Sequence, residues 1–439
     1  MEAKSEETHF LTIGLLHNNN KNKNDVVSVA VSDETAVCYK SFLSQSTEAT
    51  TSFFKTSFNG LNALSGVGIL STPYALASGG WLSLILLFII AIITFYTALL
   101  IQSCMDADSS IRTYPDIGER AFGRKGRLLV STFMNLELYL VATGFLILEG
   151  DNLNNLLPGM GFEINGFRVG GNQGFILIVG LIILPTILLN NMGLVSYISA
   201  TGVVASFVIL GSIFWTGAFE GIGFHEKGEL LNLKGIPTAI SLYAFCYCAH
   251  PVFPTLYTSM GNKKNFSKVM FLSFFVCTVT YALIAVFGYL MFGSMLKSQI
   301  TLNLPINKVS SKIAIYTTLV NPIAKYALIL TPIIHTIENR FRSYCKKRSF
   351  SVFIRTVLLI STVAVALTVP FFGLLMSLVG AFLSVTASIL LPCLCYLKIS
   401  GAYQRFGFQV GIIGCILVFG IAILVVGTYT SIVEIIGQL

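Results

Sequence analysis

The sequence predicts an all-α polytopic membrane protein with 11 transmembrane helices, in which ten form a five-plus-five inverted repeat. Three observations favour this fold class: the composition, the recurrence of long apolar stretches, and two interrupted stretches at corresponding positions. Of the 439 residues, 54% are hydrophobic and 11% are charged, with a mean hydropathy of +0.78. Since an ordinary soluble protein has about 25% charged residues, the chain is expected to lie in a lipid bilayer.

Apolar stretches long enough to cross a bilayer, about 17–25 residues, recur along the chain from residue 53 onward. We place the spans at 53–77, 81–104, 128–149, 174–190, 197–219, 237–258, 267–291, 313–336, 353–370, 373–396 and 406–430. They leave no room for a soluble catalytic domain. The predicted organisation is a cytosolic tail at 1–51, a first repeat at 52–219, a second repeat at 237–397, the eleventh span at 405–430, and a lumenal or outer tail at 431–439.

The positive charges predict the orientation. The polar tail at 1–51 lacks the apolar core of a signal peptide, and we expect it to be disordered. If this tail is cytosolic, the loops on its side hold sixteen Lys and Arg residues and the opposite loops hold six. This bias supports a cytosolic amino terminus. The net charge of +8 therefore reflects topology and does not indicate nucleic-acid binding.

The first span is interrupted by four consecutive residues, Ser65, Gly66, Val67 and Gly68. Lipid cannot form hydrogen bonds with free backbone groups, so irregular backbone at membrane depth is tolerated only where it lines a cavity or is buried in protein. A broken helix also offers free N–H groups and a positive dipole end, which suit a carboxylate. The alternative is that these glycines only kink the helix, because Gly is common in membrane helices.

A second interruption lies about 185 residues further on, in the sixth span, at residues 246–254 with Pro251 and Pro254. The same offset relates Pro185 in the fourth span to Pro370 in the ninth. Because each half contains five spans, an odd number, the two halves must be inverted. Paired interrupted helices in inverted halves are typical of secondary transporters.

Three motifs carry a resemblance to a known family. They are the run NALSGVGILSTPYA at 62–75, the run YPDIGERAFG at 114–123, and Pro322 followed by AKYAL at 324–328. Together they resemble the amino acid/auxin permease family, plant vacuolar amino acid transporter type, over residues 50–430. The resemblance implies the amino acid–polyamine–organocation transporter fold, with an amino acid held between spans one and six. It also implies residence in the vacuolar membrane, although the same family includes auxin carriers.

Carried onto this chain, the resemblance implies a binding site built mainly from backbone. The N–H groups of residues 65–68 would bind the substrate carboxylate, and carbonyls near the second interruption would accept from its ammonium group. Phe245 and Tyr247 would form pocket walls, although an aromatic residue in a membrane helix more often only packs. The expected substrate-binding residues are Asn62, Ser65, Gly66, Val67, Gly68, Phe245, Cys246, Tyr247 and Cys248.

Three ionisable residues lie deep in the spans: Glu137, His250 and Lys325. Such residues are costly in a membrane and are functional candidates by default. The 185-residue offset maps Glu137 to Pro322, within one turn of Lys325, so both are expected at similar depth. We predict that Glu137 and Lys325 pair in at least one state and that a proton moves during the cycle. A permanent ion pair that only joins two helices is the alternative.

His250 lies at the second interruption and has two interpretations. It either senses pH, because histidine titrates near physiological pH, or caps a free carbonyl beside Pro251. No cofactor is expected, with the proton gradient as the energy source. Sodium is the competing ion, with Thr317, Thr318 and the carbonyls near Ser65 as ligands. A fixed charge on Lys325 would repel a bound cation, which favours protons.

Other functions receive less support from the sequence. Cys246 and Cys248 lie two positions apart on a helix and therefore point about 200° apart, so no metal site is expected. The chain has no His-Glu-x-x-His helix and no nucleophile beside a base, so no enzyme is predicted. An amino acid sensor that retains the pocket and signals through the tail stays open as an alternative. The expected partners are an amino acid substrate, protons and the lipid bilayer.

Overall fold

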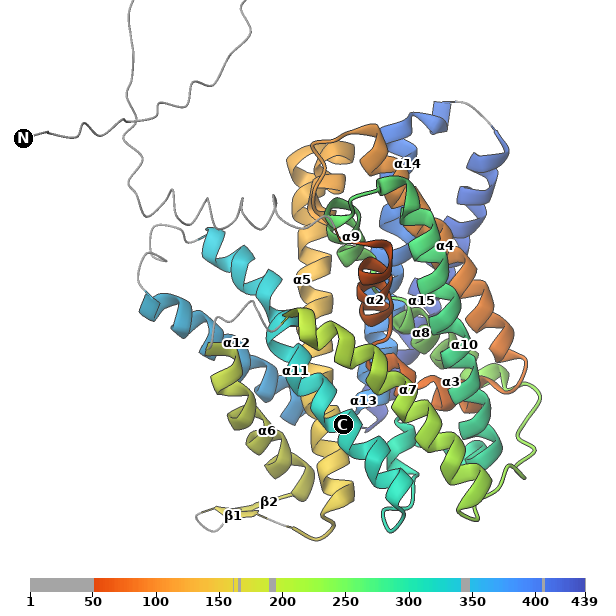
Figure 1. Cartoon of the computed structure of the whole chain (residues 1–439), viewed down its shortest axis with the longest axis vertical. Coiled ribbons are helices and arrows are strands. Elements are labelled where there is room, and N and C mark those ends of the chain that lie inside the picture. Colours follow the sequence, from red (N-terminus) through yellow and green to blue (C-terminus); the bar gives the residue numbers. More distant parts are fainter. Residues whose placement is uncertain are drawn as a thin grey trace, which may run out of the picture. The chain divides into compact units, whose positions relative to one another are not determined.

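The computed structural model describes residues 51–160, 162–164, 167–188, 195–340, 348–404 and 407–438. The predicted cytosolic tail lies outside the described residues, apart from Thr51 at its end. Residues Ala49–Leu439 form one compact unit, and everything below concerns this unit (Figure 1). The fold is helical, apart from one short antiparallel hairpin in which β1 (Phe162–Ile164) pairs with β2 (Phe167–Val169).

The first half of the unit contains the first interrupted span and four continuous helices. Its elements are α2 (Phe53–Leu64), the 3₁₀-helix η1 (Val67–Leu70), α3 (Thr72–Gly79), α4 (Ser83–Ala107), α5 (Tyr114–Leu156), α6 (Gly171–Leu188) and α7 (Val195–Phe219). Within α5, Gly123 has φ 66° and interrupts the helical backbone. This separates a first segment before Gly123 from the long membrane span that follows.

The second half repeats this arrangement and adds one helix. Its main elements are α8 (Ile236–Cys246), η4 (His250–Val252), α9 (Phe253–Ser259), α10 (Phe266–Phe292), α11 (Val309–Arg340), α12 (Arg348–Thr368), α13 (Phe372–Leu378), η8 (Val379–Ser384), η9 (Thr386–Leu390), α14 (Leu391–Ser400) and α15 (Phe408–Gln438). Both η8 and η9 are π-helical. Short 3₁₀ turns precede or follow the helices: η3 (Leu233–Gly235), η5 (Lys263–Asn265), η6 (Gly293–Met295), η7 (Ile300–Leu302) and η10 (Ala402–Gln404).

Ten helical segments of the described chain are long and apolar enough to cross a membrane, which confirms the polytopic all-α class. The first expected span is missing from this set because residues 53–79 form three short helices instead of one long one. The count of eleven therefore stays a prediction. At the other end, α15 continues to Gln438, so that the expected outer tail is helical over 431–438.

The two halves make matching contacts, as a repeat requires. Helix α2 packs against α10, and its counterpart α8 packs against α4. Likewise α7 packs against α11, while α14 packs against α5. The first span packs against the sixth through α3 and α8, and the third against the eighth through α5 and α11. The contact of α2 with α7 in the first half corresponds to that of α8 with η8 in the second. The internal repeat inferred from the 185-residue offset is thus reflected in the packing.

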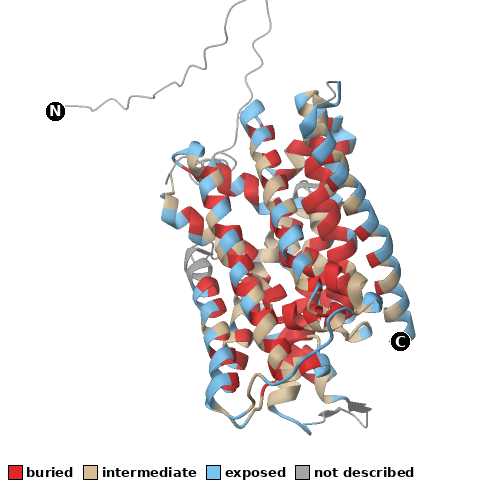
Figure 2. Cartoon of the chain, turned by 90° about the vertical axis from the view of Figure 1, so that its right-hand side faces the viewer, coloured by how far each residue is buried: buried red, intermediate tan, exposed pale blue. Residues whose placement is uncertain are grey.

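Burial identifies the central elements. In the segment Phe372–Ser400, 83% of the most apolar stretch is buried, against 28% in Phe408–Gln438. Figure 2 shows buried residues in the interior and exposed residues along the outer helix that carries the C label. Exposed apolar side chains on these outer helices are what a bilayer favours. The sixth span and the π-helical tenth span therefore form the core around which the site is built.

The motif at 114–123 has a structural explanation. Thr113 and Asp116 form a capping box that begins α5, which satisfies free N–H groups of its first turn. The Tyr114 hydroxyl donates to the Ala387 carbonyl in η9. A methyl group on Gly126 would lie 2.2 Å from the Gly118 carbonyl oxygen, so the backbone turns too closely here for a larger residue. The motif therefore fixes the start of α5 against the tenth span.

Candidate functional site

The first interruption exposes backbone donors. Helix α2 ends at Leu64, and Gly66 has φ −92° and ψ −166°, an extended conformation that separates α2 from η1. The Ser65 and Gly66 N–H groups donate back to Leu61 and Leu64. For the N–H groups of Val67 and Gly68, no acceptor is found among the described residues. Val67 and Gly68 are both buried, and the carboxylate-binding role expected for the N–H groups of residues 65–68 stays a prediction.

The second interruption follows Cys246, where α8 ends. Tyr247 has φ −110° and ψ 24°, and the chain continues through irregular residues into η4 and α9. The Tyr247 N–H donates to the Ala244 carbonyl at 3.2 Å, and the Cys248 N–H to the Phe245 carbonyl at 3.3 Å. Both expected interruptions are therefore real breaks in the helices rather than kinks.

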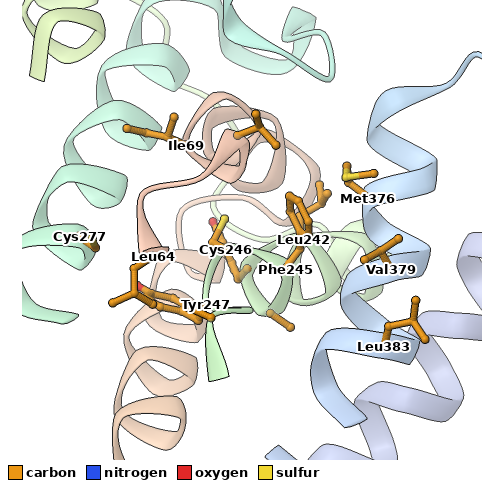
Figure 3. Close-up of a cluster of buried hydrophobic side chains, with 14 of the residues drawn as sticks. Leu64, Ile69, Leu242, Phe245, Cys246, Tyr247, Cys277, Met376, Val379 and Leu383 are labelled. Carbon is orange, nitrogen blue, oxygen red and sulfur yellow. The ribbon is translucent and has the colours of Figure 1, made fainter. Parts of the chain in front are cut away.

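The two interruptions touch each other. The Cys246 thiol lies 3.5 Å from the Gly68 carbonyl oxygen, and a methyl group on Gly68 would come within 2.9 Å of the Cys246 sulfur. Figure 3 shows Cys246 at the end of α8, beside the chain of the first interruption, with Phe245 directed toward the helix that carries Met376 and Val379. Gly68 is needed for this close approach, because any side chain would separate the two breaks.

The site is closed in this conformation. Phe245, Cys246 and Tyr247 are each at most 3% exposed, and they pack among apolar side chains (Figure 3). A neighbouring pocket between α2, α7 and α10 has room for about one water molecule. It is lined by Leu61, Ser65, Val203, Ser206, Phe207, Val276, Cys277, Thr280 and Tyr281. The amino acid expected between spans one and six would therefore need the two interruptions to move apart.

Tyr281 of α10 joins both interruptions and was missed by the sequence analysis. Its hydroxyl donates to the Leu64 carbonyl at the first break and lies 3.3 Å from the Cys246 carbonyl at the second. A phenol has one proton, so it serves one of these carbonyls at a time. No sequence signal identified this residue, because a tyrosine in an apolar helix is usually a packing residue.

Lys325 is directed at the first interruption. Its ammonium group donates to the Ser65 carbonyl at 3.3 Å, and the side chain is 8% exposed. A methyl group on Gly202 of α7 would lie 1.9 Å from Asn62 Oδ1 and 3.0 Å from the Lys325 nitrogen. Asn62 and Lys325 thus face the same glycine. The Ser65 carbonyl, one of the oxygens expected for a sodium ion, is therefore engaged by a lysine in this state.

Glu137 lies elsewhere in the core. Its Oε1 accepts a hydrogen bond of 2.7 Å from Ser384, at the end of the π-helical η8, and the residue is 2% exposed. Within the described chain, the structure contains no ion pair between Glu137 and Lys325. The expected pairing in at least one state stays a prediction, and in this state each residue has its own partner.

His250 is fully buried and its tautomer follows from its contacts. The Nε2 atom lies 3.1 Å from the Thr94 carbonyl oxygen and 2.9 Å from the Thr97 hydroxyl. A carbonyl only accepts, so Nε2 carries the proton. The Nδ1 atom has no partner among the described residues. Thr97 also lies 2.7 Å from the Ser388 carbonyl in η9, which connects the second interruption to the tenth span.

The π-helical segments η8 and η9 were not foreseen. Ser384 ends the first and bonds to Glu137. Ser388 lies in the second, and its carbonyl accepts from Thr97, which also contacts His250. A π-helix often marks a functional position in a membrane or soluble helix. As for metals, the described residues contain no cluster of three or more His, Cys, Asp or Glu side chains that could hold an ion.

Comparison with known proteins agrees with this architecture. The sequence model of one family, described as transmembrane amino acid transporter protein, matches residues 49–433. Amino acid transporter AVT1I of Arabidopsis thaliana is 60% identical over 388 residues, covering 88% of this chain and 96% of that protein. Amino acid transporter AVT1J of the same plant is 61% identical over 393 residues, covering 89% and 93%. More distantly, Amino acid transporter ANT1 is 27% identical over 423 residues, covering 87% and 93%.

These matches extend across both interruptions, both repeats and most of α15, and they confirm the resemblance to the amino acid/auxin permeases carried by the three motifs. The chain therefore belongs to the transmembrane amino acid transporter protein family.

Proposed function

We propose that this protein is a proton-linked secondary transporter of neutral amino acids in an endomembrane, the vacuolar membrane of a plant cell. The observation that carries the proposal is the contact between the two interruptions. It joins Gly68, which with Val67 has an unpaired N–H group, to Cys246. The carbonyls of Leu64 and Cys246 both lie within reach of the Tyr281 hydroxyl. An α-amino acid has a carboxylate and an ammonium group, which match one set of donors and one set of acceptors.

The surroundings of the interruptions support a neutral substrate. Ile69, Leu242 and Phe245 belong with Cys246 to the same cluster of buried apolar side chains (Figure 3). The charged group directed at the first interruption is Lys325, and it is engaged with Ser65. A substrate with a charged side chain would have to bury that charge without a partner, which is costly.

Proton linkage is supported by the position of Lys325. A sodium ion beside Ser65 would compete with an ammonium group already bonded to that carbonyl, and like charges repel strongly in a low dielectric. A proton needs no such site. It is bound and released by an ionisable side chain, and Glu137 and His250 are buried, titratable and bonded to the tenth span or its neighbours.

Alternating access then has a physical description. In the closed state the two interruptions are held together by Tyr281 and by the contact of Gly68 with Cys246. Substrate binding would replace the Tyr281 hydroxyl at these carbonyls. Protonation of Glu137 would alter its bond to Ser384, and the first and sixth spans would move against the helices that flank them.

The test is uptake of a radiolabelled neutral amino acid mixture into proteoliposomes containing the purified protein, with and without an imposed pH gradient. Uptake that follows the pH gradient supports the proposal. Uptake that requires a sodium gradient instead would establish the sodium-coupled alternative. Tight binding without flux under any gradient would favour a sensor, and uptake of auxin in preference to amino acids would contradict the substrate class. Fractionation of plant membranes with an antibody tests the vacuolar location.

A further inference from the structure

A second group of buried acidic and amide side chains lies at the end of α5 that carries Leu156, away from the two interruptions (Figure 1). Glu149 is 1% exposed, and Asn152, one turn further along α5, is fully buried. Asp151 is half-buried. Two further amides complete the group: Asn172 from the start of α6, and Gln299, which is fully buried beside η7.

Four of the six amide N–H groups of Asn152, Asn172 and Gln299 are engaged. Asp151 accepts from Asn172 at 2.8 Å and from Gln299 at 2.8 Å. The Asn152 amide donates to the Gln299 side-chain oxygen at 2.7 Å and to the Leu148 carbonyl at 2.8 Å. Gln299 therefore connects Asp151 to Asn152, and through them it fixes the loop before α11 to α5.

Several acceptors of the group, in contrast, have no hydrogen-bond donor. Both carboxyl oxygens of Glu149, and the Oδ1 atoms of Asn152 and Asn172, have no hydrogen-bonding partner among the described residues. Four buried acceptors thus lack a donor, while two amide N–H groups, one on Asn172 and one on Gln299, are left without a hydrogen bond among the described residues. Buried polar atoms are satisfied in the great majority of proteins, so this group lacks donors, and it fits a ligand that supplies a positive charge or a proton.

The charged residues near this group do not supply the missing positive charge. The elements that pack against this end of α5 include α6, η7 and α13, and none of the three contains a charged residue. In the loop before α11 and its first turns, the titratable groups are Lys297, Lys308, Lys312 and Tyr316, and no ion pair joins a lysine to Glu149 or Asp151 within the described chain. The charged groups of α12, Arg348 and Arg355, lie toward its opposite end.

We propose that Glu149 is a proton-binding site. An ionised carboxylate without a partner at 1% exposure is unfavourable, whereas a proton removes the charge and supplies a donor. Asp151, in contrast, is less buried and already accepts hydrogen bonds from two amides. This inference rests on the proton-linked function proposed above and gives it a second proton site, about 18 Å along α5 from Glu137.

The test is infrared spectroscopy of the purified protein at neutral pH, because a buried protonated carboxyl group has its own C=O absorption. We expect Glu149→Gln to remove one such band and Glu149→Asp to shift it. The exposed Glu119 of α5 provides the matched control, since Glu119→Gln should leave the band unchanged. After transfer to D₂O, the wild-type band should shift as the proton exchanges, and Asp151→Asn should leave the Glu149 band in place.

These outcomes distinguish a failure of the Glu149 proton site from a failure of the proposed proton-linked transport. A band that persists in both Glu149 variants overturns the proton site, even if uptake follows a pH gradient. A carboxylate band at Glu149, together with thermal stabilisation by sodium or potassium that Glu149→Gln abolishes, would replace the proton by a metal cation. If the Glu149 band is confirmed but uptake ignores the pH gradient, the site stands and the proposed proton linkage fails.

Discussion

The Lys325 ammonium group donates a hydrogen bond to the Ser65 carbonyl oxygen, 3.3 Å away, although the two residues are 260 positions apart. The bond joins α11 of the second repeat to the residue at which α2 of the first repeat unwinds. A carbonyl released by a broken helix in a membrane needs a donor, and here a charged side chain supplies it. Any movement of the first interruption must therefore break or carry along this bond.

Replacing Lys325 by Met tests this bond while keeping a side chain of similar length. A hydrogen bond to a charged group contributes about 1.5–3 kcal/mol, so we expect kcat/KM for uptake to fall by about tenfold or more. Uptake should also lose its response to a pH gradient. Proteoliposome uptake measures both. Lys297→Met, at an exposed loop position, should transport normally, and a pH response that survives in Lys325→Met would exclude Lys325 from coupling.

Gly202→Ala should disrupt the same region from the other side. Its methyl group would lie 1.9 Å from Asn62 Oδ1 and 3.0 Å from the Lys325 nitrogen, and overpacking of this kind costs about 1–3 kcal/mol. We expect a lower melting temperature and reduced uptake. The matched control is Gly211→Ala on the same helix, which meets no atom within 4 Å.

The Gly211 variant should be neutral or slightly stabilised, because alanine is favoured over glycine inside a helix by about 0.5–1 kcal/mol. Thermal unfolding of the two purified variants, side by side, gives the comparison. Equal stability and equal uptake in both would show that Asn62 and Lys325 are not held against α7 as described.

Tyr281→Phe should loosen the closed state, because it removes the hydroxyl that serves both interruptions. A net loss of about 1 kcal/mol corresponds to a several-fold larger open population. The readout is the rate at which Cys277, which lines the adjoining pocket, reacts with a maleimide, followed by mass spectrometry. Tyr316→Phe, at an exposed position of α11, should leave the rate unchanged. A Tyr281→Phe rate equal to that of wild type would mean that other contacts keep the site closed.

The interruptions were predictable because glycine and proline inside an apolar stretch have few structural explanations. The run from Ser65 to Gly68 and the pair Pro251 and Pro254 mark backbone that cannot continue as helix, and the equal offset between them reveals the repeat. Both features depend on local sequence and on spacing along the chain, and both can be read from a single sequence.

The side-chain contacts were not predictable, because they depend on how helices from distant parts of the chain pack. The 185-residue offset gives Glu137 and Lys325 a similar depth, but it does not give the direction in which each points around its helix axis. Glu137 is directed toward Ser384 and Lys325 toward Ser65. Tyr281 and the π-helical turns at 379–390 likewise depend on how helices from different parts of the chain pack, and nothing in their own sequence distinguishes them from ordinary membrane helix.

Glu137 and Ser384 provide the most direct test of proton coupling. Glu137→Gln keeps an acceptor for the Ser384 hydroxyl, 2.7 Å from Oε1 in the wild type, but removes the titratable group. We expect a folded protein that still binds substrate, with uptake that no longer responds to a pH gradient. Ser384→Ala leaves Glu137 titratable, so uptake should weaken without losing that response, whereas Ser361→Ala, on the outer helix α12, should have no effect.

The combination of the two substitutions distinguishes coupling from architecture. If the bond transmits the protonation of Glu137 to the tenth span, Ser384→Ala should add little in the Glu137→Gln background, because the two residues act as a unit and their effects are not additive. Additive losses of uptake, or a Glu137→Gln protein that unfolds while Ser384→Ala behaves as wild type, would identify Glu137 as a packing element of α5. Unchanged gradient-driven uptake in Glu137→Gln would assign proton coupling to another residue, with Lys325, His250 and Glu149 among the buried titratable candidates of the described chain.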